Sequence, residues 1–223
     1  MVALLRRSCK KKMKRLGVLL SGRGSNFTAI AYNIAQGKLT GCEIAVVISN
    51  KAHAAGLAAA RERGLKALAI EARGRKRVEH DAEIIATLRE HGVDLVILAG
   101  YMRLLSPEFV QAFPERILNI HPSLLPAFPG LDAQEQAFNY GVHVAGCTVH
   151  FVDEELDHGV IVLQKTVPVL PGDDAQTLSA RILEQEHVAY SEAIARVLSG
   201  EYRVAGRRYV RAGCPDGSAS RNS

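Results

Sequence analysis

The chain has 223 residues, of which 48% are hydrophobic, and this length and composition suit one globular domain with a sizeable core. Its formal net charge of +5 comes from residues 1–15, which hold seven Lys and Arg and no acid. The rest of the chain has 21 basic and 23 acidic residues, so no nucleic-acid partner is expected. No apolar run approaches the roughly 20 residues that span a bilayer, and the opening MVALLRR is too short for the core of a signal peptide, so we expect a cytoplasmic protein without a membrane partner.

The first half of the chain alternates apolar runs with amphipathic segments. Strands are predicted over residues 15–21, 42–50, 66–70, 94–100 and 116–120, and helices over residues 26–37, 54–64, 78–92 and 106–113. The run DLVILAG (94–100) is almost wholly apolar, which is typical of a central parallel strand covered on both faces. This alternation predicts an α/β fold with an open, mostly parallel twisted sheet and helices on both faces.

The pattern changes in the second half. Residues 123–130 contain two prolines and a glycine and predict an irregular loop, followed by a helix over 131–141. Two antiparallel strands, 144–152 and 160–169, are predicted around the turn DEELDHG, and a long helix runs from about residue 174 to 198. We expect a basic disordered tail over residues 1–14, a single domain over 15–205 and a flexible tail over 206–223.

The stretch LLSGRGSNF (19–27) places glycines between the first strand and the first helix. Backbone N–H groups at a helix N-terminus and the helix dipole together favour a phosphate, and Ser25 is suited to cap this helix and to donate a hydroxyl. Two glycines alone are equally consistent with a tight turn that binds no ligand. A dinucleotide is disfavoured because Phe27 occupies the position of the third glycine, so a phosphate monoester fits better.

In ILNIHPSLLP (117–126), an apolar strand carries two polar side chains just before it ends. Residues two apart in a strand share a face, so Asn119 and His121 point together while Ile120 is buried opposite, and Pro122 ends the ladder. An amide that stabilises an oxyanion beside an imidazole that moves a proton meets the needs of acyl transfer. The alternative is a hydrogen-bonded core histidine next to a strand-end asparagine.

A carboxylate would orient such a histidine and favour its charged form. The loop FVDEELDHG (151–159) offers four acids, although an ordinary acidic turn also explains it. No G-x-S-x-G elbow suggests a covalent acyl-enzyme, and no H-x-H or H-E-x-x-H spacing suggests a metal. The four cysteines, Cys9, Cys42, Cys147 and Cys214, lack paired spacing and are expected to be reduced thiols.

The motifs SGRGSN, LAGYMRLLSP, LNIHPSLLP and DEELDHG with VLQKTVPV together resemble the folate-dependent phosphoribosylglycinamide formyltransferase family. They occur in the family's order and cover roughly residues 15–205. The resemblance implies a Rossmann-like formyltransferase fold. It also implies transfer of the formyl group from 10-formyltetrahydrofolate, a co-substrate, to the amine of glycinamide ribonucleotide in de novo purine biosynthesis, through a tetrahedral intermediate and without a metal, in a monomer or homodimer.

The resemblance also implies a set of site residues. The catalytic residues would be Asn119, His121 and Asp157. The nucleotide would be bound by Gly24, Ser25, Asn26 and Glu186. The folate would be bound by Arg77, Met102, Arg103, Leu104, Leu105, Asn119, Asp153, Glu154, Glu155, Leu156 and Asp157. The chain departs from the family pattern at His158, where the family usually has a small or acidic residue, and in its basic N-terminal extension.

Three other functions are compatible with parts of the sequence. A formyltetrahydrofolate deformylase would use water as acceptor and is expected to carry an added N-terminal regulatory domain. A methionyl-tRNA formyltransferase is expected to carry a further C-terminal β domain. A non-catalytic nucleotide- or RNA-binding module would depend on the basic tail.

Overall fold

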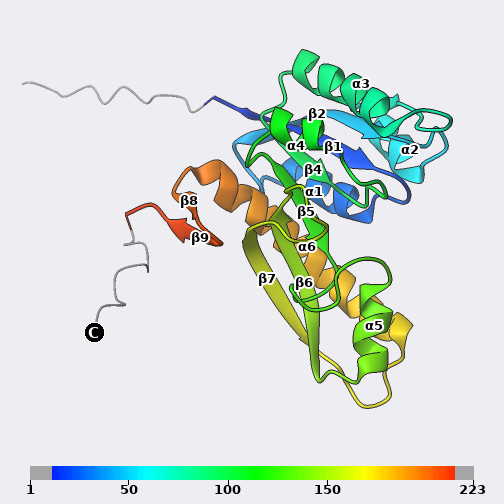
Figure 1. Cartoon of the computed structure of the whole chain (residues 1–223), viewed down its shortest axis with the longest axis vertical. Coiled ribbons are helices and arrows are strands. Elements are labelled where there is room, and N and C mark those ends of the chain that lie inside the picture. The colour runs from blue at the N-terminus through cyan, green and yellow to red at the C-terminus, as the bar shows by residue number, and fades with distance from the viewer. Residues whose placement is uncertain (1–11, 214–223) are drawn as a thin grey trace, which may run out of the picture.

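The computed structural model describes residues 12–213, which form a twisted sheet covered by helices and a separate hairpin (Figure 1). The strands are β1 (Lys14–Leu20), β2 (Cys42–Ser49), β3 (Ala67–Ala69), β4 (Leu95–Leu98), β5 (Ile117–His121), β6 (Val144–Phe151), β7 (Ile161–Pro168), β8 (Tyr202–Ala205) and β9 (Arg208–Arg211). The helices are α1 (Ser25–Ala35), α2 (Ala55–Glu62), α3 (Arg77–Glu90), α4 (Pro107–Ala112), α5 (Ala133–Tyr140) and α6 (Ala175–Ser199). Every predicted helix and strand is confirmed, with boundaries that shift by two residues or fewer.

The main sheet has seven strands in the order β3-β2-β1-β4-β5-β6-β7. Strands β1 to β5 are parallel, β6 runs antiparallel to β5, and β7 runs antiparallel to β6. This confirms the predicted open α/β sheet with antiparallel strands toward the C-terminus. The chain reverses its direction of strand addition between β1 and β4, and open α/β sheets bind ligands beyond the carboxyl ends of the strands at such a point.

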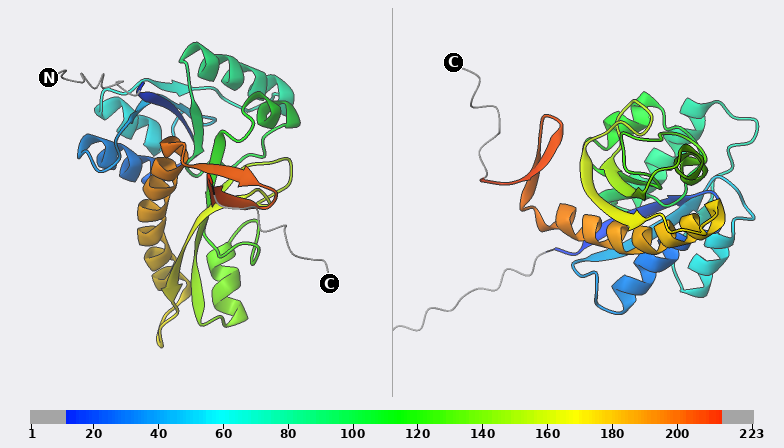
Figure 2. Two further views of the ribbon diagram at one scale, coloured as in Figure 1. Left: turned by 90° about the vertical axis from the view of Figure 1, so that its left-hand side faces the viewer. Right: turned by 90° about the horizontal axis from the view of Figure 1, so that it is seen from below.

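Helices cover both faces of the sheet. The core on one face includes side chains of α1, α2 and α6, and Figure 2 shows α6 running along this side of the molecule. The core on the other face includes Phe109 of α4, Phe113 just after that helix, and Ile84 and Leu88 of α3. All four residues of β4 are buried, which explains why this strand is apolar throughout.

Local signals define several helix ends. Ser106 caps α4 by accepting a hydrogen bond from Phe109 N at 3.3 Å, and Pro107 follows it at the first helical position. The prediction that Ser25 caps α1 is wrong. Gly24 occupies the cap position with a left-handed φ of 71°, and a Cβ there would lie 3.1 Å from Gly56 Cα, so the chain enters the helix through a turn that glycine adopts without strain.

The two predicted tails need correction where the structure describes them. Lys14, assigned to the N-terminal tail, begins β1 and bonds through Nζ to Asp94 Oδ1 at 3.3 Å. The flexible tail predicted from residue 206 is wrong for residues 206–213, because β8 and β9 form an antiparallel hairpin around Gly206. The predictions for residues 1–11 and 214–223, including Cys9 and Cys214, lie outside the described residues.

The buried cysteines are free thiols in the interior. Desolvation raises the pKa of Cys42 to about 11 and that of Cys147 to about 12, which keeps both protonated near neutral pH. Among the helices of residues 12–213, none combines the length and the apolar character needed to cross a membrane.

Candidate active site

The polar side chains at the end of β5 meet an acid from the loop between β6 and β7. His121 Nδ1 lies 3.3 Å from Asp157 Oδ2, and both side chains are largely buried. Asp157 has a left-handed φ of 51°, and its Oδ2 accepts a hydrogen bond from Gly130 N at 2.9 Å. The three residues predicted to be catalytic, Asn119, His121 and Asp157, therefore converge at one edge of the sheet.

A second histidine, absent from the sequence prediction, completes this cluster. His150 lies in β6, directly opposite Asn119 in the antiparallel register, so both side chains project from the same face. Asn119 Nδ2 is 3.2 Å from His150 Nε2, and the same ring nitrogen is 3.8 Å from Asp157 Oδ1. Because side chains alternate between the two faces of a strand, the sequence predicts that His150 and Thr148 share a face of β6. Only the register of β5 and β6 places His150 beside Asn119.

The partners of His150 define its protonation. Its Nδ1 lies 2.7 Å from the carbonyl oxygen of Phe151 and therefore carries the ring hydrogen and donates a hydrogen bond to that oxygen. Desolvation lowers the pKa of His150, although the Phe151 carbonyl and Asp157 oppose the shift. The neutral ring keeps a lone pair on Nε2 that accepts one Asn119 N–H, which orients the amide and leaves its second N–H for another acceptor.

The partners of His121 differ from those of His150. Its Nε2 lies 2.8 Å from the carbonyl oxygen of Phe128, so this nitrogen donates a hydrogen bond, while Nδ1 faces the Asp157 carboxylate. Both ring nitrogens of His121 thus face oxygen atoms. The site therefore places two imidazole rings beside a single carboxylate, that of Asp157.

The loop predicted to bind phosphate begins α1 and contacts α6. Asn26 Nδ2 donates a hydrogen bond of 2.7 Å to Glu186 Oε2, and both side chains are buried. Desolvation raises the pKa of Glu186, and the hydrogen bond from Asn26 offsets this only in part. Gly24 is buried at the turn, while Ser25 is half-buried and lines a groove of about 860 Å³ between α1 and α6. The four residues predicted to bind the nucleotide are therefore close together.

The segment Met102–Leu105 is held at both of its ends. Met102 N donates to Ser21 Oγ at 2.8 Å, in the loop after β1, and Ser106 N donates to the buried Asp81 Oδ2 at 2.7 Å. Between these anchors, Met102 and Leu104 are 66% and 55% exposed. A segment with fixed ends thus presents apolar side chains to solvent, next to the point where the strand order reverses.

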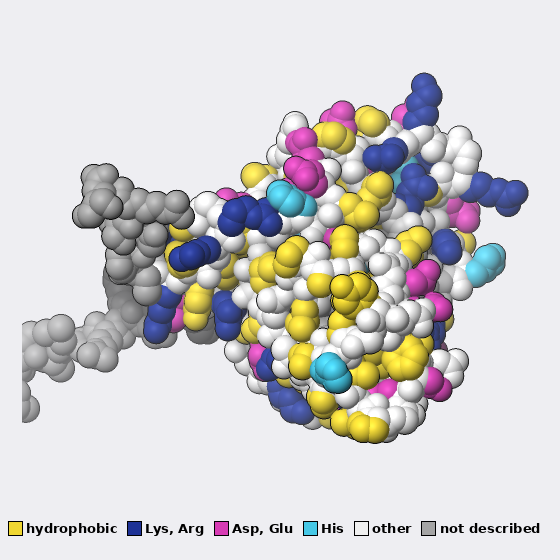
Figure 3. Space-filling view, turned by 60° about the horizontal axis from the view of Figure 1, so that its bottom comes forward, with side chains coloured by type: hydrophobic (Ala, Val, Ile, Leu, Met, Phe, Trp, Pro, Cys, Tyr) yellow, Lys and Arg dark blue, Asp and Glu magenta, His cyan; other side chains and the backbone are white. Residues whose placement is uncertain are grey.

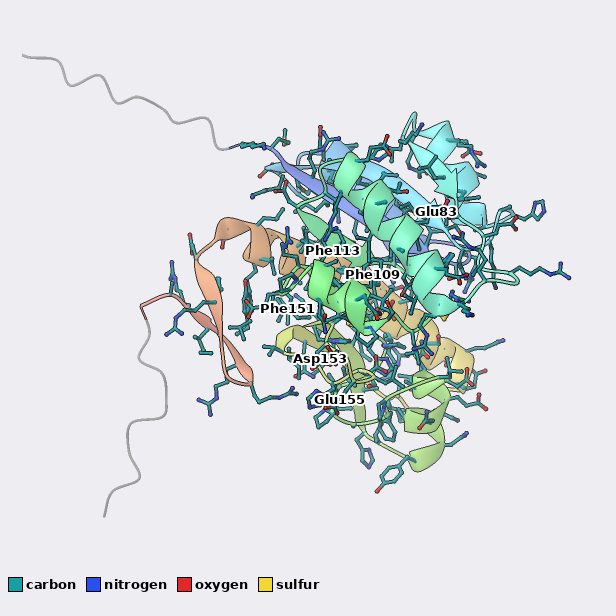
Figure 4. The ribbon with its side chains drawn as sticks, turned by 45° about the horizontal axis from the view of Figure 1, so that its top comes forward. Glu83, Phe109, Phe113, Phe151, Asp153 and Glu155 are labelled. Atoms are coloured by element: carbon teal, nitrogen blue, oxygen red, sulfur yellow. The ribbon has the colours of Figure 1, made fainter. Side chains whose placement is uncertain are left out.

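The remaining residues predicted to bind folate lie in two places. Arg77, the first residue of α3, lines a pocket of about 230 Å³ with Arg103 and Leu104. The acidic loop after β6 carries the others, and Figure 4 shows Asp153 and Glu155 in that loop, beyond Phe151. Within this loop Asp153 Oδ2 pairs with His158 Nδ1 at 2.8 Å. Leu105 differs from its neighbours because it packs against the core on the α3 and α4 face.

The surface around these elements is mixed in character. Figure 3 shows one face on which hydrophobic side chains gather toward the centre, while Lys and Arg are interspersed with acids nearer the edge. Among residues 12–213, no group of three or more His, Cys, Asp and Glu side chains is arranged to hold a metal ion.

Known proteins resemble this chain over most of its length. A family model described as formyl transferase matches residues 14–194. The phosphoribosylglycinamide formyltransferase of Escherichia coli (strain K12) is 42% identical over 188 residues, which cover 84% of this chain and 88% of that protein. The crystal structure of glycinamide ribonucleotide transformylase 1 from Symbiobacterium toebii is 50% identical, with a TM-score of 0.86 and coverage of 89% and 94% of the two chains.

Longer relatives also match. Trifunctional purine biosynthetic proteins adenosine-3 of insects and vertebrates are 40–47% identical, and the chain spans only 14–20% of their length. A formyltetrahydrofolate deformylase from Pseudomonas syringae pv. tomato is more distant, with 26% identity, a TM-score of 0.84 and coverage of 90% of this chain and 66% of that one. The family model and the close similarity of the shorter relatives agree with the site geometry: the chain belongs to the formyl transferase family and, within it, to the phosphoribosylglycinamide formyltransferases.

Proposed function

We propose that this chain transfers the formyl group of 10-formyltetrahydrofolate to the amine of glycinamide ribonucleotide, by direct attack through a tetrahedral intermediate. The observation that carries the proposal is the contact of His121 with Asp157 beside the amide of Asn119, at the carboxyl end of β5. An oriented amide N–H is a donor suited to an oxyanion, and an imidazole next to a carboxylate is suited to move a proton.

The nucleotide would lie on the α1 side of this site. The N-terminus of α1 offers backbone N–H groups to a phosphate, and Gly24 allows the chain to approach it closely. Glu186, held by Asn26, offers a carboxylate oxygen to ribose hydroxyl groups. A phosphate monoester of a ribose is therefore a better acceptor for this site than water.

The folate would lie along the segment Met102–Leu105 and the loop Asp153–Asp157. Exposed Met102 and Leu104 offer apolar contacts to a flat ring, and the guanidinium groups of Arg77 and Arg103 suit the carboxylates of its glutamate moiety. These contacts hold the donor so that its formyl group reaches the end of β5.

Formyl transfer then needs one oxyanion and one relocated proton. The substrate amine forms a bond to the formyl carbon, and the carbonyl π electrons move onto oxygen, where the free Asn119 N–H stabilises them. The bond to N10 breaks, N10 keeps the electron pair and gains a proton, and the amine loses one. Since His121 Nε2 already donates to Phe128, we assign the mobile proton to Nδ1, which Asp157 holds at 3.3 Å.

The first test is absorbance-monitored release of tetrahydrofolate from 10-formyltetrahydrofolate, with and without glycinamide ribonucleotide. Release that requires the nucleotide supports the transferase. Release at the same rate without the nucleotide would identify a deformylase and overturn the proposal. Release in neither condition would refute formyl transfer from this donor.

The second test removes the amide. Asn119→Ala is expected to lower kcat on the order of a hundredfold or more, because one preorganised oxyanion donor is lost, while the affinity for each substrate changes little. Asn139→Ala, at an exposed position of α5, is the matched control and should keep the wild-type rate. A kcat within twofold of wild type for Asn119→Ala would remove this residue from the mechanism.

The same proposal covers the setting of the reaction. We expect the enzyme to act in the cytoplasm on two small-molecule substrates, as a monomer or homodimer, without a metal, a membrane or a nucleic-acid partner.

A further inference from the structure

The hairpin formed by β8 and β9 is attached to the body of the protein by aromatic contacts. The ring of Tyr209 meets that of Phe151 edge-on with centroids 5.4 Å apart, and it stacks on Tyr202 at 5.5 Å. The Arg196 guanidinium of α6 lies over the Tyr202 ring at 5.2 Å. Figure 1 shows the hairpin next to the end of α6, and these contacts join it to the last residue of β6.

The loop between β6 and β7 starts at that residue and is tightly closed at its base. Phe151 N donates a hydrogen bond of 2.9 Å to the carbonyl oxygen of Val160, which holds the two ends of the loop together. A Cβ on Gly159 would lie 1.7 Å from the carbonyl oxygen of Phe151, so only glycine allows this closure. The loop that carries Asp157 therefore leaves and rejoins the sheet at one point, and Asp157 lies two residues before the closing Gly159.

The turn of the hairpin contacts the loop between Asp157 and this base. Arg207 Nη2 donates a hydrogen bond of 2.6 Å to the carbonyl oxygen of His158, the residue after Asp157. The imidazole of His158 in turn pairs with Asp153 at 2.8 Å, but the two side chains are 45% and 40% exposed, and an ion pair so exposed contributes little. Arg207 Nη1 also lies 3.4 Å from His158 Nδ1, so this one arginine makes both side-chain contacts between the turn of the hairpin and His158.

Asp157 needs such support because of its backbone. A left-handed φ of 51° is unfavourable for a residue with a Cβ and persists when the surroundings hold it. Gly130 N holds the Asp157 carboxylate from one side at 2.9 Å. Arg207 holds the carbonyl of His158, the residue after Asp157.

We propose that Arg207 is a positioning residue that holds the loop 152–159 in the conformation in which Asp157 faces His121. The effect on turnover rests on the function proposed above, whereas the effect on the loop does not. Loss of the bond frees the peptide between His158 and Gly159. This lowers the fraction of molecules in which Asp157 faces His121 and weakens the folate-binding surface of the same loop. The nucleotide site around Asn26 is formed by α1 and α6 and is unaffected.

The test compares Arg207→Ala and Arg207→Lys with Arg208→Ala, which removes the adjacent exposed guanidinium from the same hairpin. In the ligand-free protein, amide hydrogen exchange within residues 152–159 is expected to be about three- to tenfold faster in Arg207→Ala than in the wild type, because one charge-assisted hydrogen bond is lost at an exposed site. Arg207→Lys keeps a donor and is expected to restore part of the protection. Arg208→Ala should match the wild type.

Kinetics provide the second measurement. Arg207→Ala is expected to lower kcat and raise the KM for 10-formyltetrahydrofolate by roughly three- to tenfold, with an unchanged KM for glycinamide ribonucleotide. A general loss of folding would move both KM values. Unchanged exchange in the loop of Arg207→Ala would overturn the inference, as would equal effects of Arg207→Ala and Arg208→Ala. A wild-type protein without transferase activity would refute the proposed function instead, and the exchange result would still decide the role of Arg207.

Discussion

The buried carboxyl group of Glu186 gives a prediction about the balance of stability and binding. Its side chain is 6% exposed and accepts one hydrogen bond, from Asn26 Nδ2, while Asn26 Oδ1 is buried and accepts none from the described residues. Glu186→Gln keeps the size and the acceptor oxygen and adds an N–H that can donate to Asn26 Oδ1. We expect the variant to be more stable than the wild type near pH 7 and to bind the nucleotide less well.

The sign and the size follow from the pKa of Glu186. Desolvation raises this pKa in the folded state, so below the unfolded-state value, about 4.3, both states are protonated and the wild type suffers no penalty. As the pH rises from there to the folded pKa, only the unfolded state ionises, and the wild type loses about 1.4 kcal/mol of stability per pH unit. Above the folded pKa the loss is constant. The additional amide hydrogen bond contributes about 1 kcal/mol more to the variant.

Urea denaturation between pH 4.5 and pH 8 measures this difference. The stability of Glu186→Gln relative to wild type is expected to increase with pH and then level off, while the KM for glycinamide ribonucleotide rises, because a neutral amide is a weaker acceptor for ribose hydroxyl groups. Glu184→Gln, an exposed position on the same helix, is the matched control. A stability difference between Glu186→Gln and wild type that is the same at every pH would refute the reasoning.

Three further substitutions test the scaffold of the site. His150→Phe should lower kcat about tenfold and leave both KM values within twofold of wild type, because the Asn119 amide loses the acceptor at 3.2 Å that orients it. A change in KM without a change in kcat would contradict this. Gly146→Ala should lower the free energy of unfolding, measured in urea, by about 3 kcal/mol, because its Cβ would lie 2.0 Å from the Lys165 carbonyl oxygen in the paired strand. Wild-type stability in this variant would show that the two strands move apart at little cost. Tyr190→Phe should lower the free energy of unfolding by about 1–3 kcal/mol, because the hydroxyl of Tyr190 lies within hydrogen-bonding distance of two buried strand carbonyls, Leu118 O at 2.8 Å and Leu98 O at 3.0 Å. An unchanged Tm in thermal unfolding would mean that other donors replace this hydroxyl.

The sequence by itself determined the fold class, the order of the elements and most of the chemistry of the site. Hydrophobic periodicity, glycine stops and the Ser106–Pro107 start are local signals, and they located each main element to within two residues. The motif around Asn119 and His121 was readable because two residues of one strand share a face whatever the rest of the chain does. The same local patterns failed at the C-terminus, where they did not predict β8 and where β9 falls in the segment predicted as a flexible tail.

Only the tertiary structure decided which distant residues meet. His150 lies beside Asn119 through the register of β5 and β6, Asn26 meets Glu186 across 160 positions of sequence, and Arg207 reaches the carbonyl of His158 through the docking of a hairpin. Strand register and the docking of one element on another depend on the packing of the whole core and not on the spacing of residues within a segment. Local pattern therefore identifies groups that are able to react, and the packed fold brings together the groups that orient them.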